Sequence, residues 1–166
     1  NQIDYIKIGD TAVIEGNNLI KHLFLNKMGY ILENNFAQYA YFNCGGSFVG
    51  NNSFDTLIFT PGFEYILEFG AIQTINKQWN ISGNCEGPIF IKSSYNGRVA
   101  TIHSTNAFVS GSHLSLRDIL ASGNIPFTAS QSVDLGNNNN WDIDTMAIRS
   151  LYWVNGNGNW NDSNQW

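Results

Sequence analysis

Two glutamates, Glu33 and Glu68, have a residue type and a spacing that could support catalysis in this 166-residue chain. They close two similar stretches of sequence, residues 30–33 and 65–68. Hydrolysis of a glycosidic bond uses two carboxyl groups about 5–10 Å apart. Repeats stacked at about 4.8 Å would place these two at roughly that distance. Each glutamate also lies beside an Asn-bearing turn, where a carboxylate simply faces water. We favour this second interpretation and predict no catalytic residue.

The chain has three histidines, His22, His103 and His113. His22 falls at the same repeat position as Tyr39, which favours a packing role. His103 and His113 could lie in neighbouring repeats and form half of a metal site, but the sequence places no carboxylate or cysteine partner at ligand spacing. We therefore predict structural or surface roles for all three.

The acidic end of the chain offers the oxygen ligands that Ca²⁺ prefers. Asp134, Asp142 and Asp144 flank a run of asparagines at residues 137–140. The order Asp-x-Asp-x-Asp-Gly of an EF-hand loop is missing, and an Asn run equally forms a solvated turn. A calcium site at the three aspartates stays an open alternative, and no other metal or cofactor is predicted.

Four aromatic residues, Tyr95, Trp153, Trp160 and Trp166, could stack on sugar rings. The three tryptophans stand among Gly and Asn near the end of the chain. There they equally serve as hydrophobic anchors of a linker, which is the interpretation we prefer.

Cys44 and Cys85 could form one disulfide in a secreted protein. The repeats place them about two coils apart, a separation of ~9.6 Å that exceeds the ~7 Å limit for bridged Cα atoms. We predict two unpaired, buried cysteines, unless a loop carries Cys85 backwards.

The elements that must position these residues repeat themselves. Asn pairs at 17–18, 34–35 and 51–52 open three units, and the pairs are 17 residues apart. Within each unit, two short runs of β-branched or aromatic residues are separated by Gly, Asn or Pro, which is typical of short strands and turns. An extra residue at Ser53 would bring Phe24, Tyr41 and Phe59 into one internal aromatic ladder. The Asn pairs would mark a corner, because Asn tolerates the left-handed conformation.

Units of this length cannot bury a face alone, and stacking them solves the problem. The sequence predicts an all-β fold, a right-handed parallel β-helix over residues 1–149, with little or no helix. An antiparallel sandwich is the alternative, but it gives the repeats no reason to align. Trp141 would cover the last coil. Residues 150–166 are predicted to be a Trp/Gly/Asn-rich linker or the start of a next tandem module, and we expect the chain to be a piece of a longer protein.

Composition excludes several function classes. The net charge is −5, the sequence pI is about 4.9, and charged residues make up 13% of the chain. No run of basic residues is present, so nucleic acid and anionic membrane surfaces are not expected partners. No stretch reaches the 18 or so apolar residues that a membrane helix needs, so membrane insertion is not expected. The abundance of Asn, Ser, Thr, Gly and aromatic residues is typical of a β-rich extracellular surface.

The order of motifs from Asn52 onward resembles a known family, the β-helical repeat module of very large surface proteins secreted by the type IX system of gliding and biofilm-forming bacteria. The matching stretches are residues 52–62, 73–75, 81–85, 91–94, 100–102, 116–119, 121–123 and 134–141. Residues 152–166 resemble the linker with which the next such module begins.

This resemblance implies a non-catalytic, adhesin-like module at the cell surface, acting as spacer and display element in adhesion or gliding motility. It implies neighbouring tandem modules as partners, with surface glycans or secretion and motility machinery as further ones. It also implies O-glycosylation at Asp-Thr followed by an apolar residue, which this chain has at Thr11, Thr56 and Thr145. The alternative function is a carbohydrate-binding or polysaccharide-active β-helix.

Overall fold

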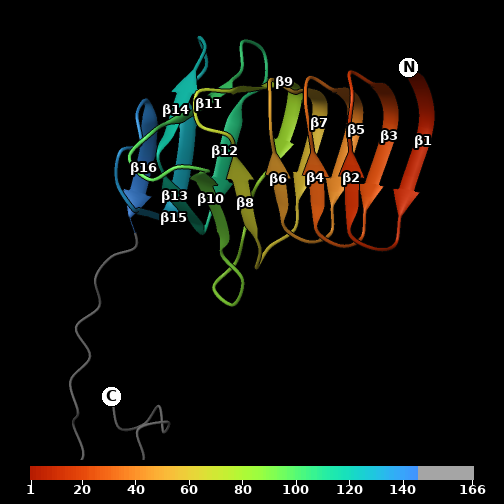
Figure 1. The fold of residues 1–166 in the computed structure, drawn as a ribbon. Helices are drawn as coiled ribbons and strands as arrows, with labels where there is room; N and C mark the ends of the chain where they lie inside the picture. The colour runs from red at the N-terminus through yellow and green to blue at the C-terminus, as the bar shows by residue number, and fades with distance from the viewer. Residues whose placement is uncertain (146–166) are drawn as a thin grey trace, which may run out of the picture.

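Short strands follow one another along the chain, and apart from the last two strands, which pair with each other, each pairs in parallel with a strand one coil away rather than with its neighbour in sequence. The computed structural model describes residues 1–145, and these form a parallel β-solenoid of about eight turns without a helix. Figure 1 shows the coils stacked side by side from the N-terminal end onward. The predicted fold class, an all-β parallel β-helix, is confirmed.

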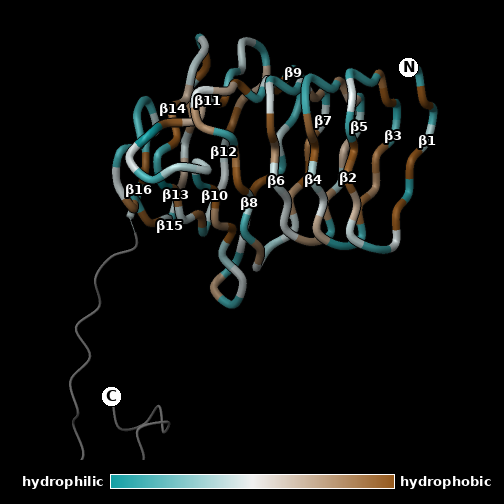
Figure 2. Tube along the Cα trace, viewed as in Figure 1, coloured by the Kyte–Doolittle hydropathy of each residue, from teal (hydrophilic) through white to brown (hydrophobic). Residues whose placement is uncertain are grey.

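Two parallel sheets form the main walls of the solenoid. The seven-stranded sheet consists of β1 (Gln2–Ile8), β3 (Leu19–Leu25), β5 (Phe36–Phe42), β7 (Ser53–Phe59), β9 (Ile72–Asn80), β11 (Ala100–His103) and β14 (Ile119–Ser122). The second sheet consists of β2 (Ala12–Ile14), β4 (Gly29–Ile31), β6 (Gly46–Phe48), β8 (Glu64–Leu67), β10 (Ile89–Ser93), β13 (Leu114–Arg117), β15 (Phe127–Asp134) and β12 (Val109–Ser112), with β16 (Trp141–Thr145) paired to β15. Apolar stretches alternate with polar corners along every coil (Figure 2).

The 17-residue register continues through β7, and the predicted extra residue at Ser53 is wrong. Phe36 pairs with Ser53 and Phe42 pairs with Phe59, both 17 residues apart. The next pairing, Phe48 with Leu67, is 19 residues apart. The chain therefore gains two residues in the turn between β7 and β8. Pro61 and Gly62 stand in this turn, outside the ladder of strands.

This register changes which aromatic residues lie inside. Leu25, Phe42 and Phe59 form one buried column, whereas Phe24 and Tyr41 belong to the adjacent column and face outward. The predicted internal ladder of Phe24, Tyr41 and Phe59 is therefore wrong. The interior instead holds a cluster of rings made by Phe42, Phe48, Phe54, Phe59, Tyr65 and Trp79.

A ladder of buried amides runs along one corner of the short coils. In successive coils Asn18 Nδ2 donates to Asn35 Oδ1 (2.9 Å), Asn35 Nδ2 to Asn52 Oδ1 (3.3 Å) and Asn52 Nδ2 to Gln73 Oε1 (3.1 Å). Each asparagine also binds backbone groups of its own turn. Asn35, for example, donates to Leu32 O (2.7 Å) in its own turn, and it also accepts from the backbone N–H of Asn18 (3.2 Å) in the preceding coil. The amides thus satisfy the corner backbone in the interior, where an unpaired polar group is costly.

The asparagine pairs mark a corner as predicted, but the left-handed residues there are not the asparagines. Gly16, Glu33 and Gly50 hold φ values of 96°, 70° and 79°. At Gly50 a side chain is also excluded by space, because a Cβ would lie 2.3 Å from Glu33 O. Asparagine is needed at this corner as both donor and acceptor, and its backbone conformation is not the reason.

The coils after β7 are longer than 17 residues: paired residues lie 29 apart between β9 and β11, and 19 apart between β11 and β14. The long strand β15 pairs with β12 through its first half and with β13 through its last residues. It bends between these halves at Gln131, where φ is 49°. Trp141 begins β16 and packs edge-on against Phe127, with ring centroids 5.2 Å apart. This placement agrees with its predicted role as an apolar cover.

The amide ladder predicts that removal of a buried asparagine side chain destabilises the fold more than removal of an exposed one. Asn35→Ala should lower the free energy of unfolding by about 2–4 kcal/mol, because it leaves several buried polar groups unpaired. The matched control is the neighbouring Asn34→Ala, which removes one exposed bond from the Asn51 N–H and should cost less than about 1 kcal/mol. Urea unfolding followed by circular dichroism measures both; equal costs would contradict the role given to the ladder.

Candidate functional site

Five aromatic rings cover the outer face of the seven-stranded sheet at its N-terminal end. We call Tyr5, His22, Phe24, Tyr39 and Tyr41 the outer ring row. Adjacent rings from β1, β3 and β5 have centroids 5.4–6.5 Å apart, and their planes are tilted by 36–52°. Tyr5 is 58% exposed, and His22 is also exposed. The row presents a continuous aromatic surface across three coils.

An irregularity repeated in each strand positions the outer ring row. In β3, Ile20 and Leu23 both point inward, with two outward residues, Lys21 and His22, between them. The pairing skips Lys21 and its partner Asp4, and then resumes at Tyr5 and His22. The ladder of strands is interrupted at this point, as at a β-bulge. The interruption re-aims the following residues, so that His22 and Phe24 both face outward.

Charge pairs flank the row on the side of the interruption. Lys21 Nζ lies 2.8 Å from Asp4 Oδ1, and this hydrogen bond holds the pKa of the Asp4 carboxyl below its usual range. Three coils further, Lys77 Nζ lies 2.6 Å from Asp55 Oδ2. Both carboxylates are thus paired with ammonium groups, and the row between them is uncharged over most of its area.

Hydrogen-bonding groups lie at the other edge of the row. Tyr41 OH donates to Asn43 Oδ1 (3.1 Å) and accepts from Thr60 Oγ1 (3.4 Å). Aromatic faces bordered by hydroxyl and amide groups can stack on the apolar face of a sugar ring and bond its hydroxyls. The arrangement can therefore bind a carbohydrate; it holds no nucleophile and no pair of free carboxylates.

The two glutamates considered for hydrolysis do not occupy equivalent positions in their coils. The expected alignment of Glu33 with Glu68 is therefore wrong. The register places Glu33 beside Gly50, and Glu68 one position earlier, beside Val49. Glu68 Oε2 accepts a hydrogen bond from Gly50 N (2.7 Å), whereas Glu33 is exposed in its left-handed turn. The Glu68 side chain thus serves the corner, whereas the Glu33 side chain faces water there.

The three aspartates considered for calcium lie apart. Asp134 Oδ1 already accepts from Gly136 N (2.8 Å) and Asn138 Nδ2 (2.6 Å) in its own turn. Asp142 pairs with Thr128, at the far end of β15 from Asp134. Among residues 1–145, no group of three or more His, Cys, Asp or Glu residues is arranged to hold a metal ion.

The histidines and cysteines partly follow prediction. His22 pairs with Tyr39 as expected, although on the outer face, and His103 bonds Ser122 Oγ (3.0 Å) rather than stacking with His113. Cys44 and Cys85 are unpaired as predicted, but Cys44 is half-buried and Cys85 exposed, so their predicted burial is wrong. The expectation that His113 lacks a cysteine partner is also wrong, because His113 contacts Cys85.

Tyr95 is 58% exposed and joins a smaller aromatic cluster on a corner loop. Its ring meets Phe69 edge-on at 5.8 Å, and the Arg98 guanidinium lies 5.3 Å from both ring centroids. One face of Tyr95 is therefore engaged by the chain itself. The other residues considered for sugar stacking, Trp153, Trp160 and Trp166, lie outside the described residues, as does the predicted boundary at residue 150.

The three threonines of the O-glycosylation pattern differ in environment. Thr11 is exposed in the turn between β1 and β2, and Thr145 is exposed at the end of β16. Thr56 is half-buried on the outer face of β7, where it pairs with Tyr39 of the outer ring row. Two of the three are thus freely accessible to a modifying enzyme.

Comparison of the chain with protein-family models, curated proteins and solved structures finds no match. Through residue 145, no helix has the length and apolar character needed to cross a bilayer.

We expect the outer ring row to contribute little to the free energy of unfolding, because its rings lie on the outer face of the sheet. Tyr39→Ala should lower the free energy of unfolding by about 1 kcal/mol, whereas Phe42→Ala, in the same strand but buried, should cost about 3–5 kcal/mol. Equilibrium unfolding in urea compares the two. A cost for Tyr39→Ala as large as that for Phe42→Ala would mean that the row holds the coils together.

Proposed function

We propose that this chain is a non-catalytic structural and adhesive module of a large secreted cell-surface protein, acting as spacer and display element in adhesion or gliding motility. One observation carries the proposal. A single column of aligned residues runs through the coils, and we call it the corner column. It passes through Asn17, Asn34, Asn51, Ile72, Thr101, Leu120 and Asn139. A solenoid kept in register over this length is a stiff element of defined length.

The family assignment within this proposal rests on the resemblance of the motif order to modules of type IX-secreted surface proteins. On that basis, the partners are neighbouring tandem modules, and the location is extracellular. The exposed Thr11 and Thr145 support the O-glycosylation that the same resemblance implies.

The spacer function predicts a fixed distance between the two ends of the corner column. Cys44 and Cys85 are first replaced by serine, and spin labels are attached at Asn17→Cys and Asn139→Cys, both exposed positions. Six coil spacings of about 4.8 Å should give one narrow distance near 29 Å, plus the reach of the labels. Pulsed electron paramagnetic resonance measures this distribution. A broad distribution, such as a flexible linker gives, would sink the spacer proposal.

A second function, carbohydrate binding, is favoured by the outer ring row. Its rings lie at neighbouring positions in three successive coils, so the surface suits an extended chain of sugars rather than a single ring. The tilted rings can stack on the apolar faces of sugars, and the polar groups of Asn43 and Thr60 at the edge can bond their hydroxyls.

Carbohydrate binding at this row predicts a selective loss on mutation. Tyr39→Ala should weaken binding to a polysaccharide identified on a glycan array by about tenfold, because loss of one stacked ring costs about 1.5 kcal/mol. Tyr95→Ala removes an equally exposed tyrosine elsewhere and is the matched control. Isothermal titration with both variants decides: equal losses, or no loss with Tyr39→Ala, would contradict a binding site at this row.

A further inference from the structure

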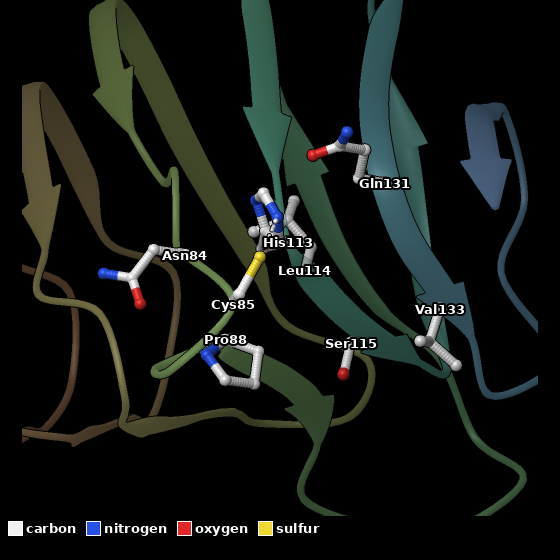
Figure 3. Close-up of a pocket in the computed structure, with 8 residues that line it drawn as sticks. All are labelled: Asn84, Cys85, Pro88, His113, Leu114, Ser115, Gln131 and Val133. Atoms are coloured by element: carbon white, nitrogen blue, oxygen red, sulfur yellow. Dashed lines mark hydrogen bonds between the residues drawn. The ribbon is translucent and has the colours of Figure 1, made fainter. Parts of the chain in front are cut away.

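A thiol and an imidazole lie in contact beside a small cavity, away from the outer ring row. Cys85 Sγ is 3.3 Å from His113 Nε2. The cavity has a volume of about 160 Å³, and Figure 3 shows the two side chains meeting at its edge. Its remaining lining is mostly apolar and includes Pro88, Leu114 and Val133.

The loop that carries Cys85 is fixed by its own hydrogen bonds. Asn84 Oδ1 accepts from Glu86 N (3.0 Å) and Gly87 N (2.8 Å), which closes a tight turn around Cys85. Gly87 O accepts from Gly62 N (3.1 Å) of the preceding coil. The backbone on both sides of Cys85 is therefore held in place, while the thiol itself is exposed.

His113 occupies a corner and has two unfavourable features there. Its φ is 53°, a left-handed conformation that costs a side chain such as histidine about 1 kcal/mol. Its Nδ1 is buried and has no hydrogen-bond partner. Glycine or asparagine would avoid the first cost, and a side chain without a ring would avoid the second. Strain of this kind gathers at functional sites.

Backbone bonds hold the imidazole in this costly position. His113 N donates to Ser130 O (3.0 Å), and His113 O accepts from Ile89 N (3.0 Å). The corner is thus tied to the coils on either side. Ile89 begins β10, the strand that follows the Cys85 loop, so the same segment positions the thiol and the imidazole.

We propose that Cys85 and His113 form a nucleophilic thiol site that reacts with disulfides carrying a small apolar group. His113 Nε2 accepts the proton of the Cys85 thiol. The Cys85 sulfur then attacks one sulfur of the disulfide and forms a mixed disulfide. The bond between the two sulfurs of the reagent breaks, and the leaving thiolate departs with the electron pair and receives the proton from His113. Cys85 is oxidised and half of the reagent is reduced, while the apolar group occupies the cavity.

The second cysteine gives an internal comparison. Cys44 is half-buried, and none of its hydrogen-bond contacts in the described part of the chain is with an imidazole. Its thiol lacks the proton acceptor that Cys85 has. Each cysteine can be replaced by serine to leave the other as the sole thiol.

The test measures thiol reactivity directly. In a Cys44→Ser background, 4,4′-dithiodipyridine should react with Cys85 at least about tenfold faster at pH 7 than with a linear peptide of residues 82–88, which carries the same cysteine without His113. His113→Asn, chosen because Asn tolerates the left-handed corner, should lower the rate to that of the peptide. Thermal unfolding confirms that the variant is folded.

Two further measurements separate a reactive site from an exposed thiol. The advantage over the peptide should shrink for oxidised glutathione, whose charged groups do not suit an apolar cavity. In a Cys85→Ser background, Cys44 should react no faster than the peptide. The proposal is overturned if folded Cys85 reacts no faster than the peptide, or if folded His113→Asn keeps the full rate.

Discussion

The structure depends on one constraint: each buried corner must satisfy its backbone polar groups through the coil above or below. In the short coils the amides of Asn18, Asn35 and Asn52 meet this need. Because each amide must face the next, the ladder fixes the 17-residue register. A slip of one residue would turn every inward side chain outward. The buried rings of Phe42 and Phe48 and the outward rings of β3 and β5 are both consequences of this register.

The repeat was enough to predict the solenoid, because the spacing of the Asn pairs survives in the structure. It was not enough to predict which rings lie inside. Alternation along a strand is interrupted in every early coil, so counting by two from Ile20 gives the wrong face for Phe24. The turn signal Pro61-Gly62 could have placed the added residues correctly. The contact of Cys85 with His113 could not be predicted, because the path of residues 84–88 sets it and no repeat does.

The outer face changes character along the solenoid. The first three strands of the seven-stranded sheet present rings, whereas Thr56 of β7 and Gln78 of β9 take the position of Tyr39 in the next two coils. The proposed stacking contacts involve the N-terminal coils alone, and the next coils present mainly polar side chains, including the Lys77–Asp55 ion pair. The proposed spacer and binding functions therefore would not compete for the same part of the chain. One module can present a binding surface at one end and add length with the rest.

The residue types that bond the corner backbone also change in the longer coils. The number of hydrogen bonds that each side chain can donate or accept explains the change. Asparagine both donates and accepts, so an amide ladder can continue from coil to coil without limit. Aspartate only accepts. At the later coils the buried Asp118 receives bonds from Gly97 N (3.1 Å) in the coil before and Asn137 Nδ2 (2.7 Å) in the coil after, with Arg117 Nε 3.6 Å away. The amide series ends earlier, at Gln73, because the next residue of its column is the apolar Ile102. Asp118 lies outside that column, and its carboxylate joins two later coils by accepting hydrogen bonds from both of them.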